Sequence, residues 1–567
     1  MPLPPAFRRV VLYSLAAAGC AWGVELPRGI ELSGGDVRKL TLGEAIEMVL
    51  QNNLEVQFDQ VGMKIEQART KFALGVFDPV FRLELTRESL QRPDITSNLT
   101  TAESLLQEAQ IRAIEANTRA IEQASGLPLS APISLPEGRI VVFDQDSDRF
   151  ESSLSFRTPL GTQIAAVARQ AKIRSTFDGD TRTITPFYTA FGGFEVRQPL
   201  LKDFGPAANL ADVRTSRINE RVSALTWEKS LSDAVASVLG TYFDMLYAQA
   251  DLRVKQDAVA ADDKLVQQNQ RRLDLGFMSP IDVQQARAQV SLDQEQLILS
   301  KNLFMERQFA LRRLITKEGR SSAAHVYLPV QTPHLDPPGL KRAEELNTAF
   351  RKRADYLAAV TDAEKQDVRL QFAKNQTWPN LDVVGTFGYN GLGEHWESAR
   401  DGAQSSQAPQ WSFGVQFSMP LGRVQSRAQL AAIQGFQEQA ILKIKQSELT
   451  VTVDVDTALS RIETSKQRVS TARQTRELNE EAVRIAYRRL EEGQISSFDL
   501  IEQQRKLYDA KSRELAARAD LNKSVVTLWQ ATGTVLENTG ISILRPERKR
   551  DLPKAAKAGG FPAKNGK

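Results

Sequence analysis

The stretch RRLDLGFMSPID at residues 271–282 recurs as RRLEEGQISSFD at residues 488–499, with six identities in twelve positions and no gap. Each copy contains paired arginines, then a glycine, then a serine three residues before an aspartate. These residues are Arg271, Arg272, Gly276, Ser279 and Asp282 in the first copy and Arg488, Arg489, Gly493, Ser496 and Asp499 in the second. Glycine commonly ends a helix, serine with an acidic residue three positions later begins one, and the arginines complement the helix dipole. Both stretches predict a tight turn between two helices.

The helices that lead into these turns are expected to be unusually long. Proline, which breaks helices, is absent from residues 207–279 and 421–545. Apolar residues recur at helical spacing over residues 207–275 and 423–492. At 1.5 Å per residue each helix would reach roughly 105 Å. A rod of that length cannot be the interior of a globular domain.

Shorter helical stretches accompany the two rods, and their lengths suggest how they pack. Four stretches of about 35 residues show helical periodicity. They lie at residues 41–75, 281–315, 340–374 and 498–532. Two of them placed end to end match one long helix, as in a cylinder wall with coiled-coil contacts. We therefore expect a duplicated unit, with a first repeat at 41–315, a linker at 316–339 and a second repeat at 340–535.

Between the helices the hydrophobic period changes from 3.6 to 2, which indicates strands. Apolar residues alternate with polar ones over residues 411–419 and 81–86. A soluble sandwich would need a second sheet to cover the apolar face, and the sequence offers none, whereas lipid could cover it. Three of the six tryptophans lie in the strand region of the second repeat, as a belt of aromatic residues at a membrane surface would require. So few strands cannot close a barrel alone, so we expect an oligomer.

The first strand region is longer than the second by about 80 residues. Within it, residues 152–157 and 162–169 read as two strands of a hairpin. The sequence leaves open whether this hairpin joins the barrel or extends beyond it.

The two ends of the chain differ in composition from the rest. Residues 1–20 carry two arginines before an apolar run, which is typical of a secretory signal peptide. Cys20 ends a segment similar to a lipoprotein cleavage site, and ordinary cleavage near Ala21 or Gly23 is the alternative. Residues 545–567 carry eight basic and two acidic residues and read as a disordered tail. The tail contributes +6 and the two arginines near the start contribute +2, so of the total charge of +4 residues 21–544 carry −4. A weakly acidic body argues against a nucleic-acid partner.

Few residues suggest chemistry. Glu502 lies one helical turn after Asp499, and its counterpart in the first copy is neutral Gln285. Around a symmetry axis, Asp499 and Glu502 would form an acidic ring that favours cations, and a solvated helix face is the alternative. No catalytic constellation, metal-ligand spacing or cofactor-binding motif is apparent, so we expect neither an enzyme nor a cofactor or metal.

These features together resemble the TolC family of outer-membrane efflux proteins. The likeness rests on TLGEAIEMVLQNNLEV (41–56), QPLLKDFG (198–205), the duplicated turns and the order of elements. It implies a mixed, mainly α fold, in which a homotrimer forms a β-barrel with four strands per chain, continued by a long α-helical barrel in the periplasm. It also implies a passive exit duct for efflux or type I secretion, which docks a periplasmic adaptor (membrane fusion) protein and an inner-membrane pump.

The resemblance also assigns roles to individual positions. Asp499 and Glu502 match the acidic ring at the periplasmic aperture of the family. The turn residues Gly276, Ser279, Gly493 and Ser496 match the surface where the adaptor packs. Leu490 and Ile495 stand where the best-known member has a hydrogen-bonded latch, so such a latch is not expected. The competing interpretation is a periplasmic coiled-coil adaptor or scaffold without a membrane barrel, and the transported substrate is left open.

Overall fold

A computed structural model describes residues 37–95, 101–125, 140–177, 186–317, 326–330, 335 and 341–542. The predicted signal peptide with Cys20, most of the linker and the basic tail lie outside these residues. Two compact units divide the chain. Unit 1 takes residues 1–67, 218–364 and 439–567, and unit 2 takes residues 68–217 and 365–438. Each unit draws on both predicted repeats, so the division into repeats stays a prediction.

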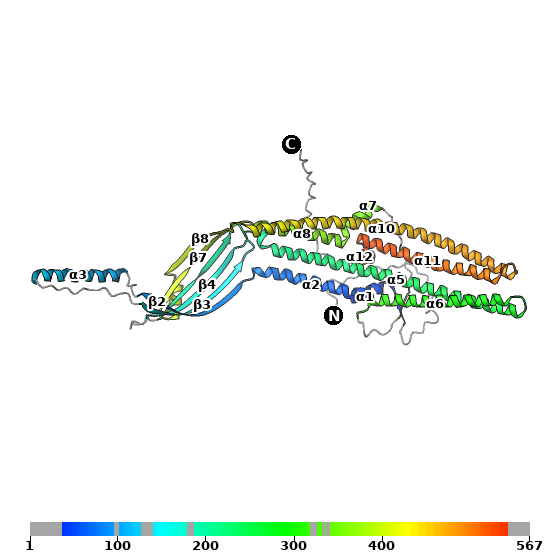
Figure 1. Ribbon diagram of the computed structural model, residues 1–567, viewed down its shortest axis with the longest axis horizontal. Helices are drawn as coiled ribbons and strands as arrows, with labels where there is room; N and C mark the ends of the chain where they lie inside the picture. Colours follow the sequence, from blue (N-terminus) through cyan, green and yellow to red (C-terminus); the bar gives the residue numbers. More distant parts are fainter. Residues whose placement is uncertain are drawn as a thin grey trace, which may run out of the picture. The chain divides into compact units, whose positions relative to one another are not determined.

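Helices dominate unit 1, which contains both hairpin turns (Figure 1). The long helices are α5 (Ala211–Asp274) and α10 (Val424–Glu491), and each begins in unit 2. They are followed by α6 (Pro280–Ile315) and α11 (Ser497–Thr532). The remaining elements are α1 (Leu42–Asn52), α2 (Leu54–Leu74), α7 (Arg342–Lys352), α8 (Ala354–Asn375), α12 (Val535–Asn538), β1 (Val37–Leu40) and β6 (Val326–Pro329), with α2 and α8 continuing into unit 2. The long helices therefore match the predicted rods to within a few residues at each end.

Two of the shorter predicted helices are interrupted. Asn53 separates α1 from α2, and Arg353 separates α7 from α8, each in extended conformation. Both residues still close the preceding helix, because their backbone N–H groups bond to Val49 and Ala349. Neither break contains proline or glycine, which is why periodicity alone predicted continuous helices.

The core of unit 1 lies where the helices meet the small parallel sheet β1·β6. Tyr242, Phe243 and Phe304 are among its largest fully buried side chains. Gln308 is buried with them and accepts from the backbone N–H of Tyr327 at 3.1 Å. Its amide thus ties α6 to β6 within an otherwise apolar core, as a buried polar group requires.

Unit 2 is built on one six-stranded antiparallel sheet with the order β2-β3-β4-β5-β7-β8 (Figure 1). The strands are β2 (Val80–Ile95), β3 (Ile140–Arg157), β4 (Gln163–Phe177), β5 (Phe187–Pro199), β7 (Asn380–Gly393) and β8 (Pro409–Ser418). Helix α3 (Thr101–Ser125) lies between β2 and β3, and α9 (Trp396–Gln404) lies between β7 and β8. The 3₁₀ turn η2 (Gly75–Phe77) precedes β2, and α4 (Pro206–Asn209) follows β5. Each strand pairs antiparallel with the next strand of this sheet, and the chain between β5 and β7 runs through the helices of unit 1.

Among the described residues the sheet has six strands, two more than the four per chain that the resemblance implies for the barrel. The predicted hairpin forms β3 and β4, with the turn Thr158 to Gly161 between them. It lies between β2 and β5 in the sheet. A four-stranded pattern came from the resemblance, which could not account for the additional residues of this chain.

The predicted fold class is confirmed: the chain is mainly helical, with antiparallel strands in one sheet. Among the described residues, no helix is both long and apolar enough to span a membrane.

Candidate functional site

The two hairpin turns of unit 1 are the sites that the sequence singled out, and their backbones follow the same geometry. Gly276 and Gly493 both have positive φ, 76° and 71°. In each turn the glycine N–H and the following N–H bond back to carbonyls of the last helical turn, such as that of Arg489 at 2.8 Å from Gln494 N. This is the Schellman arrangement, which requires a left-handed residue that glycine supplies without strain.

A capping box begins the helix after each turn. The backbone N–H of Ser496 bonds to Asp499 Oδ2 at 3.0 Å, and that of Asp499 bonds to Ser496 Oγ at 3.2 Å. Ser279 and Asp282 form the equivalent pair in the first turn. The Ser496 hydroxyl also donates to Asp499 Oδ2 at 2.8 Å, and this hydrogen bond, followed by the one from the Ser496 backbone N–H, lowers the pKa of Asp499 below its usual range. Asp499 is thus ionised, and its carboxylate also caps the N-terminus of α11 by accepting from the backbone N–H of Ser496.

Glu502 is held by two cations of its own helix. Arg505 Nη2 lies 2.7 Å and Lys506 Nζ 3.4 Å from its carboxylate oxygens. The hydrogen bond from Arg505 is the main cause that lowers the pKa of Glu502. The carboxylate is therefore ionised but partly balanced, a feature that sequence reasoning missed although Arg505 and Lys506 are spaced three and four residues on.

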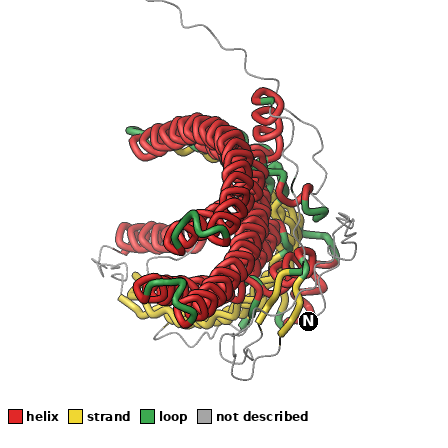
Figure 2. Tube along the Cα trace, turned by 90° about the vertical axis from the view of Figure 1, so that its right-hand side faces the viewer, coloured by secondary structure: helices red, strands yellow, loops and turns green. Residues whose placement is uncertain are grey.

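The two hairpins pack against each other near their turns, which lie next to each other in Figure 2. A small apolar cluster joins all four helices; its buried members are Leu265, Ala286, Ala486, Leu490, Leu500 and Ile501. Ile495 packs on this cluster and Leu490 belongs to it. The two positions noted for a latch thus contribute apolar packing, which fixes the hairpins side by side.

Large apolar side chains are exposed on the turns. Phe277 is 81% and Leu275 70% exposed in the first turn, followed by Ile281 at 63%. Phe498 is exposed in the second. Apolar groups gathered on a protruding surface mark an interaction site. Sequence reasoning did not select them, although Phe277 lies directly beside Gly276.

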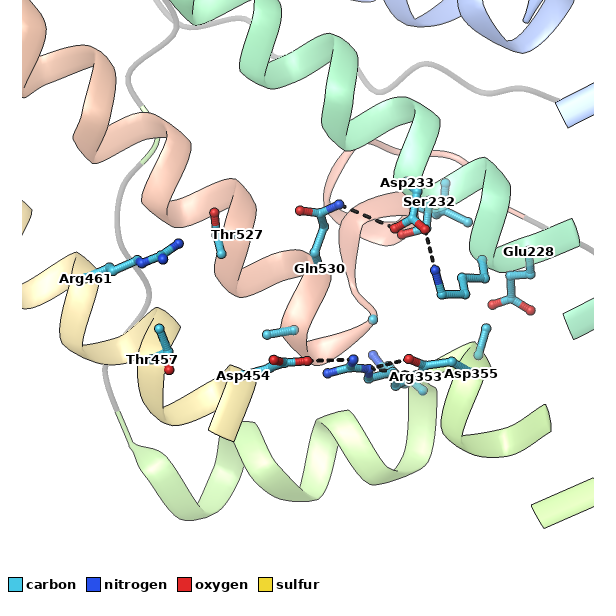
Figure 3. Close-up of a pocket in the computed structure, with 16 residues that line it drawn as sticks. Glu228, Ser232, Asp233, Arg353, Asp355, Asp454, Thr457, Arg461, Thr527 and Gln530 are labelled. Atoms are coloured by element: carbon cyan, nitrogen blue, oxygen red, sulfur yellow. Dashed lines mark hydrogen bonds and ion pairs between the residues drawn. The ribbon is translucent and has the colours of Figure 1, made fainter. Parts of the chain in front are cut away.

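A separate polar pocket of about 310 Å³ lies in unit 1 at the break between α7 and α8, away from the hairpin turns. Its main feature is Arg353, which bridges Asp355 at 2.9 Å and Asp454 at 2.7 Å (Figure 3). Gly533, in the left-handed region at φ 70°, packs so closely that an added Cβ would lie 2.8 Å from Arg353 Cα. The ion pairs join α8 to α10, so we interpret the pocket as a structural junction.

These features define a class of protein in which two packed helical hairpins and a six-stranded antiparallel sheet belong to one chain. The sequence model of the family described as outer membrane efflux protein matches residues 196–317 and 346–534. These segments make up more than half of the chain, which therefore belongs to the outer membrane efflux protein family. It is an outer-membrane efflux channel with a periplasmic helical part, and channels of this family are trimeric components of tripartite pumps.

Individual relatives are distant. The chain is 22% identical to the outer membrane protein TolC of Vibrio cholerae over 331 residues, which cover 55% of this chain and 71% of that protein. It is 23% identical to the pyoverdine export outer membrane protein OpmQ of Pseudomonas putida over 333 residues, covering 57% of this chain and 65% of that one. The chain thus spans slightly less than two thirds of OpmQ.

Solved structures show the same fold. The outer membrane channel CmeC of Campylobacter jejuni aligns with a TM-score of 0.59 at 14% identity. The alignment covers 89% of this chain and 87% of that chain. The predicted resemblance to the TolC family is confirmed.

Proposed function

We propose that three copies of this chain form an exit duct whose hairpin turns dock a periplasmic adaptor protein and, through it, an inner-membrane pump. The observation that carries this proposal is the surface of the turns: rigid backbones with exposed Leu275, Phe277 and Phe498. Such a surface suits a partner that also presents a helical hairpin, because apolar side chains at turn ends can interdigitate. Duct specificity would then come from the pump, so no substrate is assigned.

Gly276, Ser279, Gly493 and Ser496 form the proposed docking surface, and a bulky residue at either glycine should prevent docking. An added Cβ at Gly493 meets nothing within 4 Å, so the side chain of Gly493→Trp starts in open space, although the positive φ of 71° is strained for it. Gly493→Asn is the matched control, because asparagine tolerates that conformation. A photocrosslinker at Phe277 should capture a periplasmic adaptor in the native host with Gly493→Asn but not with Gly493→Trp. Equal capture by both variants would contradict docking at the turns.

We also propose that Asp499 and Glu502 form an acidic ring at the aperture. The other charged residues of the turns would instead stabilise helix ends, the arginines by complementing the helix dipole and the aspartate by capping; they are Arg271, Arg272, Arg488, Arg489 and Asp282. Replacing both acids with neutral amides, as Asp499→Asn with Glu502→Gln, should reduce cation selectivity in planar bilayers. Removing the carboxylate of Glu502 frees Arg505 and Lys506 from their partner, which strengthens the effect. Arg505→Gln is the control, and it should raise cation selectivity. Unchanged reversal potentials in both variants would place the ring elsewhere.

A further inference from the structure

The hairpin β3–β4 is an integral part of the six-stranded sheet of unit 2. β3 pairs with β2 along all sixteen residues of β2, and β4 pairs with β5 from Gln163 to Ile173. Its turn is seated on the strand-to-helix junction, where Gly205 N–H bonds to the carbonyl of Leu160 at 3.0 Å. Gly161, at φ 94°, approaches so closely that a Cβ would lie 2.5 Å from Asp203 O. The hairpin is thus fixed in the sheet on both sides and at its turn.

The apolar face of the sheet continues across the hairpin. One row of directly opposed residues crosses all six strands: Phe81, Leu154, Ala166, Phe194, Phe387 and Trp411. All of these except Ala166 are large apolar residues, and those five are exposed. The neighbouring row places Phe156 opposite Ile164, which is opposite Val196. Over these rows, near the turn, strands β3 and β4 therefore present the same apolar face to lipid as the other four strands would, whereas farther along that face the row of Arg87, Asp148 and Lys172 is charged.

The polar face continues across the hairpin as well. Arg169 of β4 contacts Glu151 of β3 at 3.4 Å and Glu195 of β5 at 2.7 Å. Arg197 of β5 then bonds to Asp382 of β7 at 3.1 Å. This charged ladder lies on the side opposite the apolar row, where a water-filled lumen would solvate it. Each of the six strands has at least ten residues, the length that crosses a bilayer when tilted.

We propose that β3 and β4 are two additional membrane-spanning strands, so that the trimer closes an eighteen-stranded wall with six strands from each copy. This inference rests on the proposed trimeric duct. The occupant of each sheet edge is a second copy: β8 of one chain pairs antiparallel with β2 of the next. β8 has ten residues, and the first ten of β2 contain no proline, since Pro93 lies beyond them.

The additional strands widen the outlet. With about 4.8 Å between strands and a tilt of about 40°, eighteen strands give a backbone radius of roughly 18 Å, against roughly 12 Å for twelve. The cross-section of the outlet would be about twice as large. Bulky solutes or polypeptides could therefore leave without the outlet being the narrowest point of the duct.

Cysteine labelling on cells tests the placement of the hairpin. Cys20 is the only cysteine of the chain, so the unmodified protein serves both as the background for single introduced cysteines and as the labelling blank. Single cysteines at Leu154 and Phe156, and at Ser153 and Ser155, sample the two faces of β3. A membrane-impermeant maleimide should label the serine positions and spare the apolar ones. Phe413→Cys and Ser412→Cys in β8 are the matched controls and should show the same alternation.

The possible outcomes separate the two proposals. Alternation in β8 with uniform labelling in β3 would overturn the eighteen-stranded wall and leave the duct intact. Loss of alternation in both strands would count against the membrane wall itself, and with it the proposed duct. In planar bilayers, wild type should admit larger neutral polymers from the outer side than a variant lacking residues 140–177. If the two proteins exclude polymers of the same size, the inference is overturned. If the variant does not insert into the bilayer, the cysteine labelling decides whether β3 and β4 cross the membrane.

Discussion

Replacing Phe58 with aspartate should leave the protein monomeric in detergent, whereas wild type should run as a trimer. Helix α2 carries a stripe of exposed apolar residues at three- and four-residue spacing: Leu54, Phe58, Val61 and Ile65. Phe58 is 77% exposed, and the stripe stays uncovered in the protomer. Such spacing is the seam of a coiled coil, and burying each large side chain contributes about 1.5 to 3 kcal/mol. A carboxylate in that seam would have to be desolvated, which opposes assembly.

Mass photometry or light scattering of the purified protein gives the oligomeric state directly. Gln67→Asp is the matched control, because nine residues at about 100° each place Gln67 on the opposite side of the helix from Phe58. That variant should remain trimeric, and so should Phe58→Leu, which keeps an apolar side chain in the seam. A trimer that persists in Phe58→Asp would show that the α2 stripe is covered by something other than a second copy.

The long helices and their turns could be predicted from the sequence because their signals are local. Absence of proline, apolar periodicity and the glycine and serine caps each act within a few residues. The breaks at Asn53 and Arg353 could not be predicted in this way. Arg353 leaves the helix to bridge Asp355 and Asp454, and Asp454 belongs to α10, far along the chain. Contacts of that range override local propensity.

The same distinction applies to the sheet and to the turns. The strands were visible as alternation, but the place of β3 and β4 between β2 and β5 depends on pairing over long separations. At the second turn, Asp499 and Glu502 could be selected by spacing, whereas their surroundings needed the structure. The serine cap on Asp499 and the cations around Glu502 change what each carboxylate contributes to the field at the turn.

Asp262 of α5 should make the packing of the two hairpins depend on pH. Its side chain is 4% exposed, and its Oδ1 has no hydrogen-bond partner among the described residues. It faces Asp293 of α6, with Asp263 on its own helix and Tyr487 of α10 and Tyr508 of α11 nearby. Burial, followed by the hydrogen bond to Asp293, raises the pKa of Asp262 to about 8. Burial and the carboxylates of Asp293 and Asp263 all oppose its ionisation.

The sign of the effect follows from proton binding. The ordinary pKa of this carboxyl is 3.8, so between that value and about 8 the folded protein holds a proton that the unfolded chain releases. The contribution of Asp262 to stability is therefore complete below about pH 4 and is lost as pH rises through 8. Within that interval the loss is about 1.4 kcal/mol per pH unit for one proton, as an upper limit.

Asp262→Asn should remove this dependence, because the amide resembles the protonated carboxyl and cannot ionise. Below about pH 4 the thermal unfolding midpoint of the variant should match wild type, and the difference should grow as pH rises, so that at about pH 8.5 the variant unfolds several degrees higher. Hydrogen exchange should show where the difference arises: at the higher pH, residues 255–270 and 484–508 should exchange more slowly in the variant. Asp263→Asn, at an exposed position of the same helix turn, should change neither measurement appreciably. If the midpoint of wild type stays parallel to that of Asp262→Asn across the pH range, Asp262 does not hold a proton between the hairpins.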